Sequence, residues 1–180
     1  MTDESPQEPS RIDRITAPEF VRGLSDLSLQ DLRARRDDCL AEREYLSLFR
    51  RLIQGRIDIL RAELDRRRRG DEPSTLVEHV AEAMSNATPQ GTVRGEAVRL
   101  TIAPGDTTTA NERVEQLVAD VSISDPRSLS EDQLGTALGR LETEERSVSA
   151  DRRRVLDVHD ALQDELKRRF KENPAEALAP

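Results

Sequence analysis

The fold of this chain is decided by residues 32–64, which read LRARRDDCLAEREYLSLFRRLIQGRIDILRAEL. An apolar side chain recurs at every seventh position of this stretch, and no proline interrupts it. The column consists of Leu32, Cys39, Leu46, Ile53 and Leu60. A seven-residue apolar repeat is typical of the seam of a coiled coil. We therefore predict one long coiled-coil helix over residues 28–70.

The pattern returns 102 positions later, which indicates an internal duplication. The second column consists of Leu134, Leu141, Val148, Val155 and Leu162. A serine precedes each stretch: Ser28 is followed three positions later by Asp31, and Ser130 is followed three positions later by Gln133. This spacing resembles a helix-capping box. We predict a second long helix over 128–172 and an all-α fold: an antiparallel two-helix coiled coil with short accessory helices and a long flexible connection. The long connection also allows a parallel pairing, or pairing between two chains.

The remaining segments are predicted to be accessory. They are an acidic N-terminal segment (1–27) with a short helix near Pro18 to Leu24, a connecting segment (71–127), and a C-terminal tail (173–180). Within the connection, apolar spacing predicts short helices over Thr75–Ser85 and Asn111–Val121, a short strand over Val98–Ile102, and a mobile loop over Thr92–Ala110.

Composition limits the function. With 2% aromatic and 36% charged residues, the 180-residue chain cannot form an ordinary globule around a thick core. The net charge of −8 argues against direct DNA binding. No apolar stretch reaches the length of a membrane span or a signal sequence, so we expect a soluble cytoplasmic protein without a membrane partner. The single cysteine, Cys39, leaves no disulfide framework and no cysteine metal site, and we expect no bound metal.

Both helices carry the same polar residues near their middles. Ser47, Arg50 and Asp58 recur as Ser149, Arg152 and Asp160, again 102 positions apart. Arginine presents a planar fork to phosphate oxygens or to the N7/O6 edge of guanine, and a carboxylate can accept hydrogen bonds from the N1 and N2 donors of guanine. The repeated set therefore favours a guanine nucleotide as ligand.

This arrangement resembles the actinobacterial anti-sigma factors of the RsiG type, whose signature on each helix is Glu-x3-Ser-x2-Arg-x3-Gln-x3-Asp. The first copy matches at Ser47, Arg50, Gln54 and Asp58, and the second matches at Glu145, Ser149, Arg152 and Asp160. The chain departs from the signature once in each copy, with Arg43 in place of Glu and Leu156 in place of Gln.

The resemblance implies that the eight matching residues bind cyclic di-GMP as a regulatory ligand. It also implies that the protein sequesters a WhiG-type sporulation sigma factor and so represses its transcription programme. Three further residues are ligand-binding candidates: Arg43, which stands at the Glu position of the signature, Glu44 beside it, and His159, which precedes the matched Asp160.

A second interpretation is a coiled-coil structural adaptor or oligomerisation module without nucleotide binding. A polar residue in a seam commonly serves only to fix the register of the helices. We do not expect an enzyme, a catalytic residue or another cofactor. His79 and His159 are the only histidines, and the sequence contains neither a glycine-rich phosphate loop nor a catalytic-triad pattern.

Overall fold

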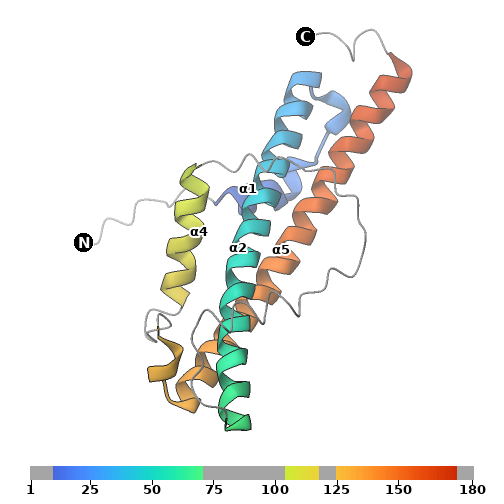
Figure 1. Cartoon of the computed structure of the whole chain (residues 1–180). Coiled ribbons are helices and arrows are strands. Elements are labelled where there is room, and N and C mark those ends of the chain that lie inside the picture. The colour runs from blue at the N-terminus through green and yellow to red at the C-terminus, as the bar shows by residue number, and fades with distance from the viewer. Residues whose placement is uncertain (1–9, 71–103, 118–124, 174–180) are drawn as a thin grey trace, which may run out of the picture. The chain divides into compact units, whose positions relative to one another are not determined.

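The computed structural model describes residues 10–70, 104–117 and 125–173, and all its regular elements in these ranges are helices. They are α1 (Arg11–Thr16), the 3-10 helices η1 (Pro18–Phe20) and η2 (Leu24–Asp26), α2 (Leu29–Arg69), α4 (Pro104–Leu117), the 3-10 helix η3 (Pro126–Ser128) and α5 (Glu131–Glu172) (Figure 1). The predicted all-α fold with two long helices is confirmed.

The chain divides into two compact units. Unit 1 comprises residues 1–50 and 146–180, and unit 2 comprises residues 51–145, so each unit contains part of α2 and part of α5. In unit 1, α5 contacts Ser47 through Arg152 and reaches Leu24 through Arg169. Arg169 follows Arg152 along α5, but its partner Leu24 precedes Ser47 in the chain. The two helices therefore run antiparallel in this unit.

Unit 2 has the same antiparallel arrangement. Gln54 contacts Glu145 of α5, while Arg67, further along α2, reaches back to Pro126, just ahead of α5. The predicted antiparallel pairing is therefore confirmed within each unit.

The seam is built from the two predicted apolar columns. All ten side chains are at most 2% exposed: Leu32, Cys39, Leu46, Ile53, Leu60, Leu134, Leu141, Val148, Val155 and Leu162. Burial of such a side chain contributes about 1.5–3 kcal/mol. The buried thiol of Cys39 has its pKa raised to about 11, chiefly by desolvation and further by the nearby Asp38 carboxylate.

Both long helices begin with a serine cap. Ser28 Oγ accepts a hydrogen bond from the Asp31 amide at 3.0 Å, and Ser130 Oγ accepts one from the Gln133 amide at 3.2 Å. The Gln133 side chain accepts in return from the Ser130 amide at 2.8 Å, which completes a capping box. A 3-10 helix precedes each cap, and η2 and η3 are themselves 102 positions apart.

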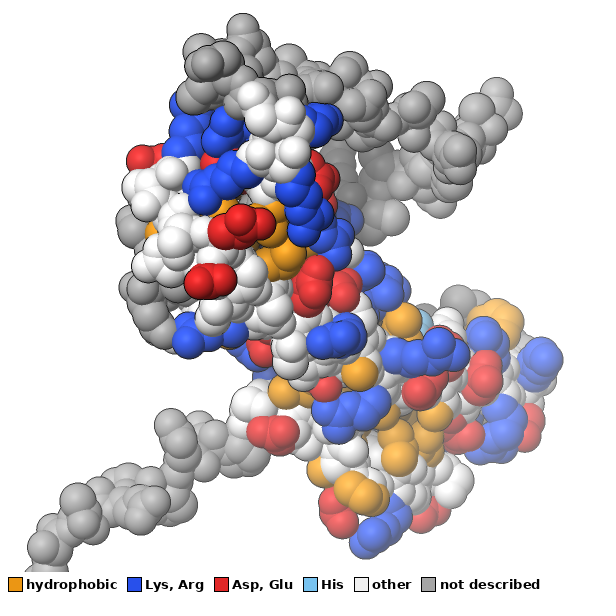
Figure 2. All heavy atoms as spheres, turned by 90° about the horizontal axis from the view of Figure 1, so that it is seen from below, with side chains coloured by type: hydrophobic (Ala, Val, Ile, Leu, Met, Phe, Trp, Pro, Cys, Tyr) orange, Lys and Arg blue, Asp and Glu red, His pale blue; other side chains and the backbone are white. Residues whose placement is uncertain are grey.

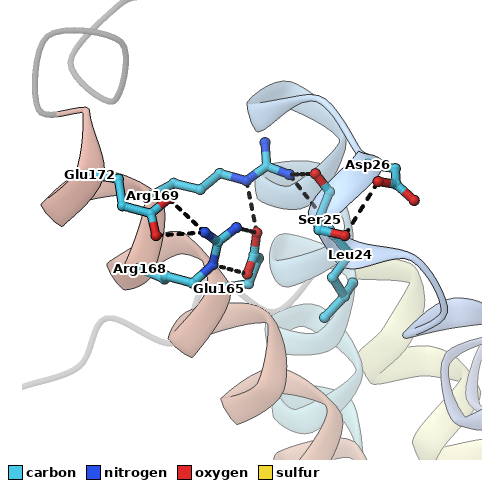
Figure 3. A network of polar contacts seen from close by, with 7 residues as sticks. All are labelled: Leu24, Ser25, Asp26, Glu165, Arg168, Arg169 and Glu172. Atoms are coloured by element: carbon cyan, nitrogen blue, oxygen red, sulfur yellow. Dashed lines mark hydrogen bonds and ion pairs between the residues drawn. The ribbon is translucent and has the colours of Figure 1, made fainter.

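A glutamate–arginine cluster holds the end of α5 in unit 1 (Figure 3). Glu165 accepts hydrogen bonds from Arg168 at 2.7 and 2.8 Å and from Arg169 at 2.9 Å. Arg169 also donates to the carbonyl oxygens of Leu24 (2.8 Å) and Ser25 (2.9 Å) in η2. The hydrogen bonds from Arg168, followed by those from Arg169, lower the pKa of Glu165 to about 2 despite its partial desolvation.

Unit 2 repeats the contacts of Glu165 and Arg169 in this cluster at positions 102 residues away. Glu63 accepts from Arg66 and Arg67, and its pKa is likewise lowered to about 2, mainly by the hydrogen bond from Arg66. Arg67 donates to the carbonyl oxygens of Pro126 and Arg127 at 3.1 Å each. The duplication seen in the sequence therefore extends to tertiary contacts.

The accessory helices repeat in the same way. In unit 1, Arg11 of α1 forms an ion pair with Glu42, whose side chain is 4% exposed. In unit 2, Arg113 of α4 pairs with Glu144 at 2.7 Å, and these two residues are again 102 positions further on. Each half of the chain thus contributes a short helix, a 3-10 turn, a serine cap and a long helix.

The predicted short helix near Pro18 to Leu24 is only partly right. Pro18 does begin η1, but Gly23 adopts a left-handed conformation (φ 64°) that separates η1 from η2. The α-helix of this segment lies earlier, at Arg11–Thr16. It ends at Thr16, and the C-cap residue Ala17 is extended because the following proline disfavours a helical conformation there.

The prediction of a mobile loop over Thr92–Ala110 is wrong for residues 104–110. Helix α4 begins at Pro104 rather than Asn111, because proline is well suited to a first helical turn. Ala110 and Val114 are buried, so packing extends the helix beyond the predicted amphipathic stretch. The predicted helix over Thr75–Ser85 and the predicted strand over Val98–Ile102 lie outside the described residues.

Candidate functional site

The two copies of the repeated set meet directly in unit 1. Arg152 Nε on α5 donates a hydrogen bond to Ser47 Oγ on α2 at 3.1 Å. Ser47 Oγ donates in turn to the Arg43 carbonyl oxygen, one turn earlier, at 2.7 Å. This bond to the helix backbone orients the hydroxyl so that its lone pair faces Arg152. A side chain from each predicted motif copy therefore contributes to one polar cluster.

A second contact between the copies lies in unit 2. Gln54 Nε2 on α2 donates to Glu145 Oε1 on α5 at 3.3 Å, and both side chains are half-buried. Asp58, one turn further along α2, is exposed. Among the described residues its carboxylate has no hydrogen-bond or ion-pair partner, so it is available to a ligand.

The other predicted residues lie in unit 1. Arg50 and Ser149 are half-buried on α2 and α5. Asp160 is largely exposed and accepts from His159 Nδ1 at 3.2 Å, whereas the His159 side chain is only 17% exposed. The structure thus brings Ser47 to Arg152 and Gln54 to Glu145, and leaves Asp58 and Asp160 facing solvent.

Several carboxylates near the unit 1 cluster are already paired with other arginines. Glu42 pairs with Arg11, and Asp151 pairs with Arg154 at 2.5 Å. Arg152 is bound to a neutral hydroxyl rather than to a carboxylate. A half-buried guanidinium with a neutral partner is suited to an anionic group such as a phosphate.

Apart from the four consecutive arginines at the end of α2, Arg66–Arg69, the basic residues of the long helices are interspersed with acidic ones. On the face shown in Figure 2, Lys and Arg side chains lie among Asp and Glu side chains. The arrangement suits a compact anion better than a nucleic-acid backbone, which requires an extended basic surface.

Sequence reasoning identified the polar set but not its partners. The hydrogen bond from Arg152 to Ser47 depends on the register of the two helices, which the repeat alone does not fix. The carbonyl-binding roles of Arg67 and Arg169 were also missed. The sequence did contain a signal for these roles: Arg67 and Arg169 lie 102 residues apart, and both belong to the duplicated Glu-x-x-Arg-Arg sequence.

Within residues 10–70, 104–117 and 125–173, no group of three His, Cys, Asp or Glu side chains could hold a metal ion. In the same part of the chain, no helix has the length and apolar character needed to cross a membrane.

Comparison with known proteins identifies one family. No curated protein matches the chain significantly. Residues 18–84 match the model of the RsiG-like family, which confirms the resemblance over η1, η2 and the whole of α2.

Proposed function

We propose that the protein is a regulatory anti-sigma factor that binds cyclic di-GMP through its repeated polar residues and sequesters a WhiG-type sigma factor. The observation that carries this proposal is the hydrogen bond between Arg152 and Ser47, because it joins the two motif copies in one cluster. The family match over 18–84 supports the same assignment.

The side chains fit the chemistry of this ligand. Arg50 and Arg152 supply guanidinium groups for phosphate oxygens or the guanine N7/O6 edge. The exposed carboxylates of Asp58 and Asp160 can accept hydrogen bonds from guanine N1 and N2. Arg152 must exchange its bond to the Ser47 hydroxyl for one to the ligand. A hydrogen bond of this kind contributes only about 1 kcal/mol, so the exchange is inexpensive.

The ligand acts as a switch only if it favours one state of the protein. Cyclic di-GMP must bind the sigma-competent form more tightly than the free form, and each tenfold difference corresponds to about 1.4 kcal/mol. By reciprocity, the sigma factor then tightens nucleotide binding by the same factor.

The test is a calorimetric titration of the protein with cyclic di-GMP, alone and mixed with a WhiG-type sigma factor, with GTP as the control nucleotide. Selective binding that the sigma factor strengthens supports the switch. No binding in either mixture would leave a structural coiled-coil adaptor. Full sigma capture by a nucleotide-blind Arg50→Ala, Arg152→Ala double variant would break the linkage between the two activities.

A matched control exists for the double variant. Arg51 and Arg153 directly follow Arg50 and Arg152, are also 102 positions apart, and are exposed. The Arg51→Ala, Arg153→Ala variant removes the same charge from the solvent side of the helices. It should retain nucleotide binding, so a loss confined to the Arg50/Arg152 variant reports contact with the ligand rather than net charge.

A further inference from the structure

The two copies of the polar set differ at two positions. Arg43 in the first copy corresponds to Glu145 in the second, and Gln54 in the first corresponds to Leu156 in the second. The intervening serine and arginine, and the distal aspartate, are identical in both copies. The two differences therefore stand out against an otherwise exact repeat.

The antiparallel register places these differences in a specific way. In unit 1, Arg152 of α5 contacts Ser47 of α2. Arg43 lies four residues before Ser47 on α2, and Leu156 lies four residues after Arg152 on the antiparallel helix α5. These two residues therefore occupy opposing positions across the seam. The corresponding positions in unit 2 are Gln54 and Glu145, which form a hydrogen bond. Unit 2 therefore has a carboxylate–amide pair, Glu145 and Gln54, whereas unit 1 has a cation, Arg43, opposite Leu156.

The environment of Arg43 lacks a compensating charge. Its side chain is half-buried, and among the described residues its guanidinium has no hydrogen-bond or ion-pair partner. Glu42 is engaged by Arg11, and the opposing Leu156 offers no acceptor. A partly desolvated cation without a partner favours the arrival of an anion.

Arg43 also lies in line with the other cations of unit 1. Arg43 and Arg50 are seven residues apart on the same side of α2, and Ser47 lies between them. Ser47 accepts a hydrogen bond from Arg152 of α5, so the side of α2 that carries Arg43 and Arg50 also meets a guanidinium of α5.

We propose that Arg43 is a further ligand-binding residue, which binds a phosphodiester group of the nucleotide together with Arg152. This inference rests on the proposed function and adds a further guanidinium to the ligand contacts of unit 1. The corresponding residue of unit 2, Glu145, is a carboxylate that accepts a hydrogen bond from Gln54, so it supplies no cation. Phosphate binding is then concentrated in unit 1.

The test compares Arg43→Ala with Arg36→Ala by titration with cyclic di-GMP at low and high salt. Arg36 is the matched control, because it lies seven residues before Arg43 on the same side of α2 and is already paired with Asp37 at 2.8 Å. We expect Arg43→Ala to weaken binding at least about tenfold at low salt, since a charge-assisted hydrogen bond is lost. The difference should shrink at high salt, and Arg43→Lys should restore part of the affinity.

Melting curves without nucleotide establish that each variant folds. If wild-type protein binds and Arg43→Ala loses no more affinity than Arg36→Ala, the role of Arg43 is refuted while the proposed function stands. If the wild-type protein does not bind cyclic di-GMP, both proposals are refuted.

Discussion

The duplicated glutamate–arginine clusters should contribute measurably to stability, and Arg67→Ala is the sharpest perturbation. The substitution removes the hydrogen bond to Glu63 at 2.6 Å and two bonds to the carbonyl oxygens of Pro126 and Arg127 at 3.1 Å each. Glu63 keeps Arg66 as a partner, and the freed carbonyl groups can be hydrated. We therefore expect a loss of about 2 kcal/mol rather than the full sum of three charge-assisted bonds.

The assay is thermal and urea unfolding followed by circular dichroism. For a chain of this size, a loss of about 2 kcal/mol lowers the melting temperature by roughly 4–8 °C. Arg68→Ala is the control, because Arg68 is exposed and its ion pair with exposed Asp65 is long, at 3.4 Å. Equal melting temperatures for Arg67→Ala and Arg68→Ala would show that the carbonyl contacts contribute nothing and would refute the reasoning.

Three further predictions concern acid stability, backbone conformation and thiol reactivity. The pKa values of Glu63 and Glu165 are lowered from 4.5 to about 2 in the folded protein, so their stabilisation is complete above pH 4.5 and is lost as the pH falls toward 2. Replacing both with Gln should flatten the unfolding free energy across this window, and an unchanged pH profile would contradict the assignment. Gly23→Ala should destabilise the protein by about 1 kcal/mol because its φ is +64°, whereas Gly55→Ala, in an open helical position, should stabilise it by up to about 1 kcal/mol. Urea midpoints measure both changes, and shifts of the same sign would count against this explanation. Finally, Cys39 is fully buried with a pKa raised to about 11, so it should react slowly with a thiol reagent at pH 8 and rapidly once urea unfolds the chain. Fast reaction in the native protein would show that the seam opens at this position.

The match to the RsiG-like family and the duplicated contacts bear on different parts of the chain. The family match ends at residue 84, before α5 begins. The internal repeat links the matched α2 to α5 through equivalent caps, ion pairs and carbonyl contacts. The second half of the chain can therefore be interpreted by comparison with the first.

The buried faces of the long helices follow from the sequence alone. Leu46, Ile53, Val148 and Val155 lie in the seam as their seven-residue spacing predicts, because helical periodicity is a local property of the chain. The serine caps were predictable for the same reason, since each involves residues only three positions apart.

The contacts between polar residues, in contrast, depend on how the helices pack. The bonds of Ser47 to Arg152 and of Gln54 to Glu145 depend on the direction and register of two helices that lie far apart in the chain. The carbonyl partners of Arg169 likewise come from η2, at the other end of the sequence. Periodicity fixes the face on which a side chain lies, but its partner across the seam is fixed by long-range packing.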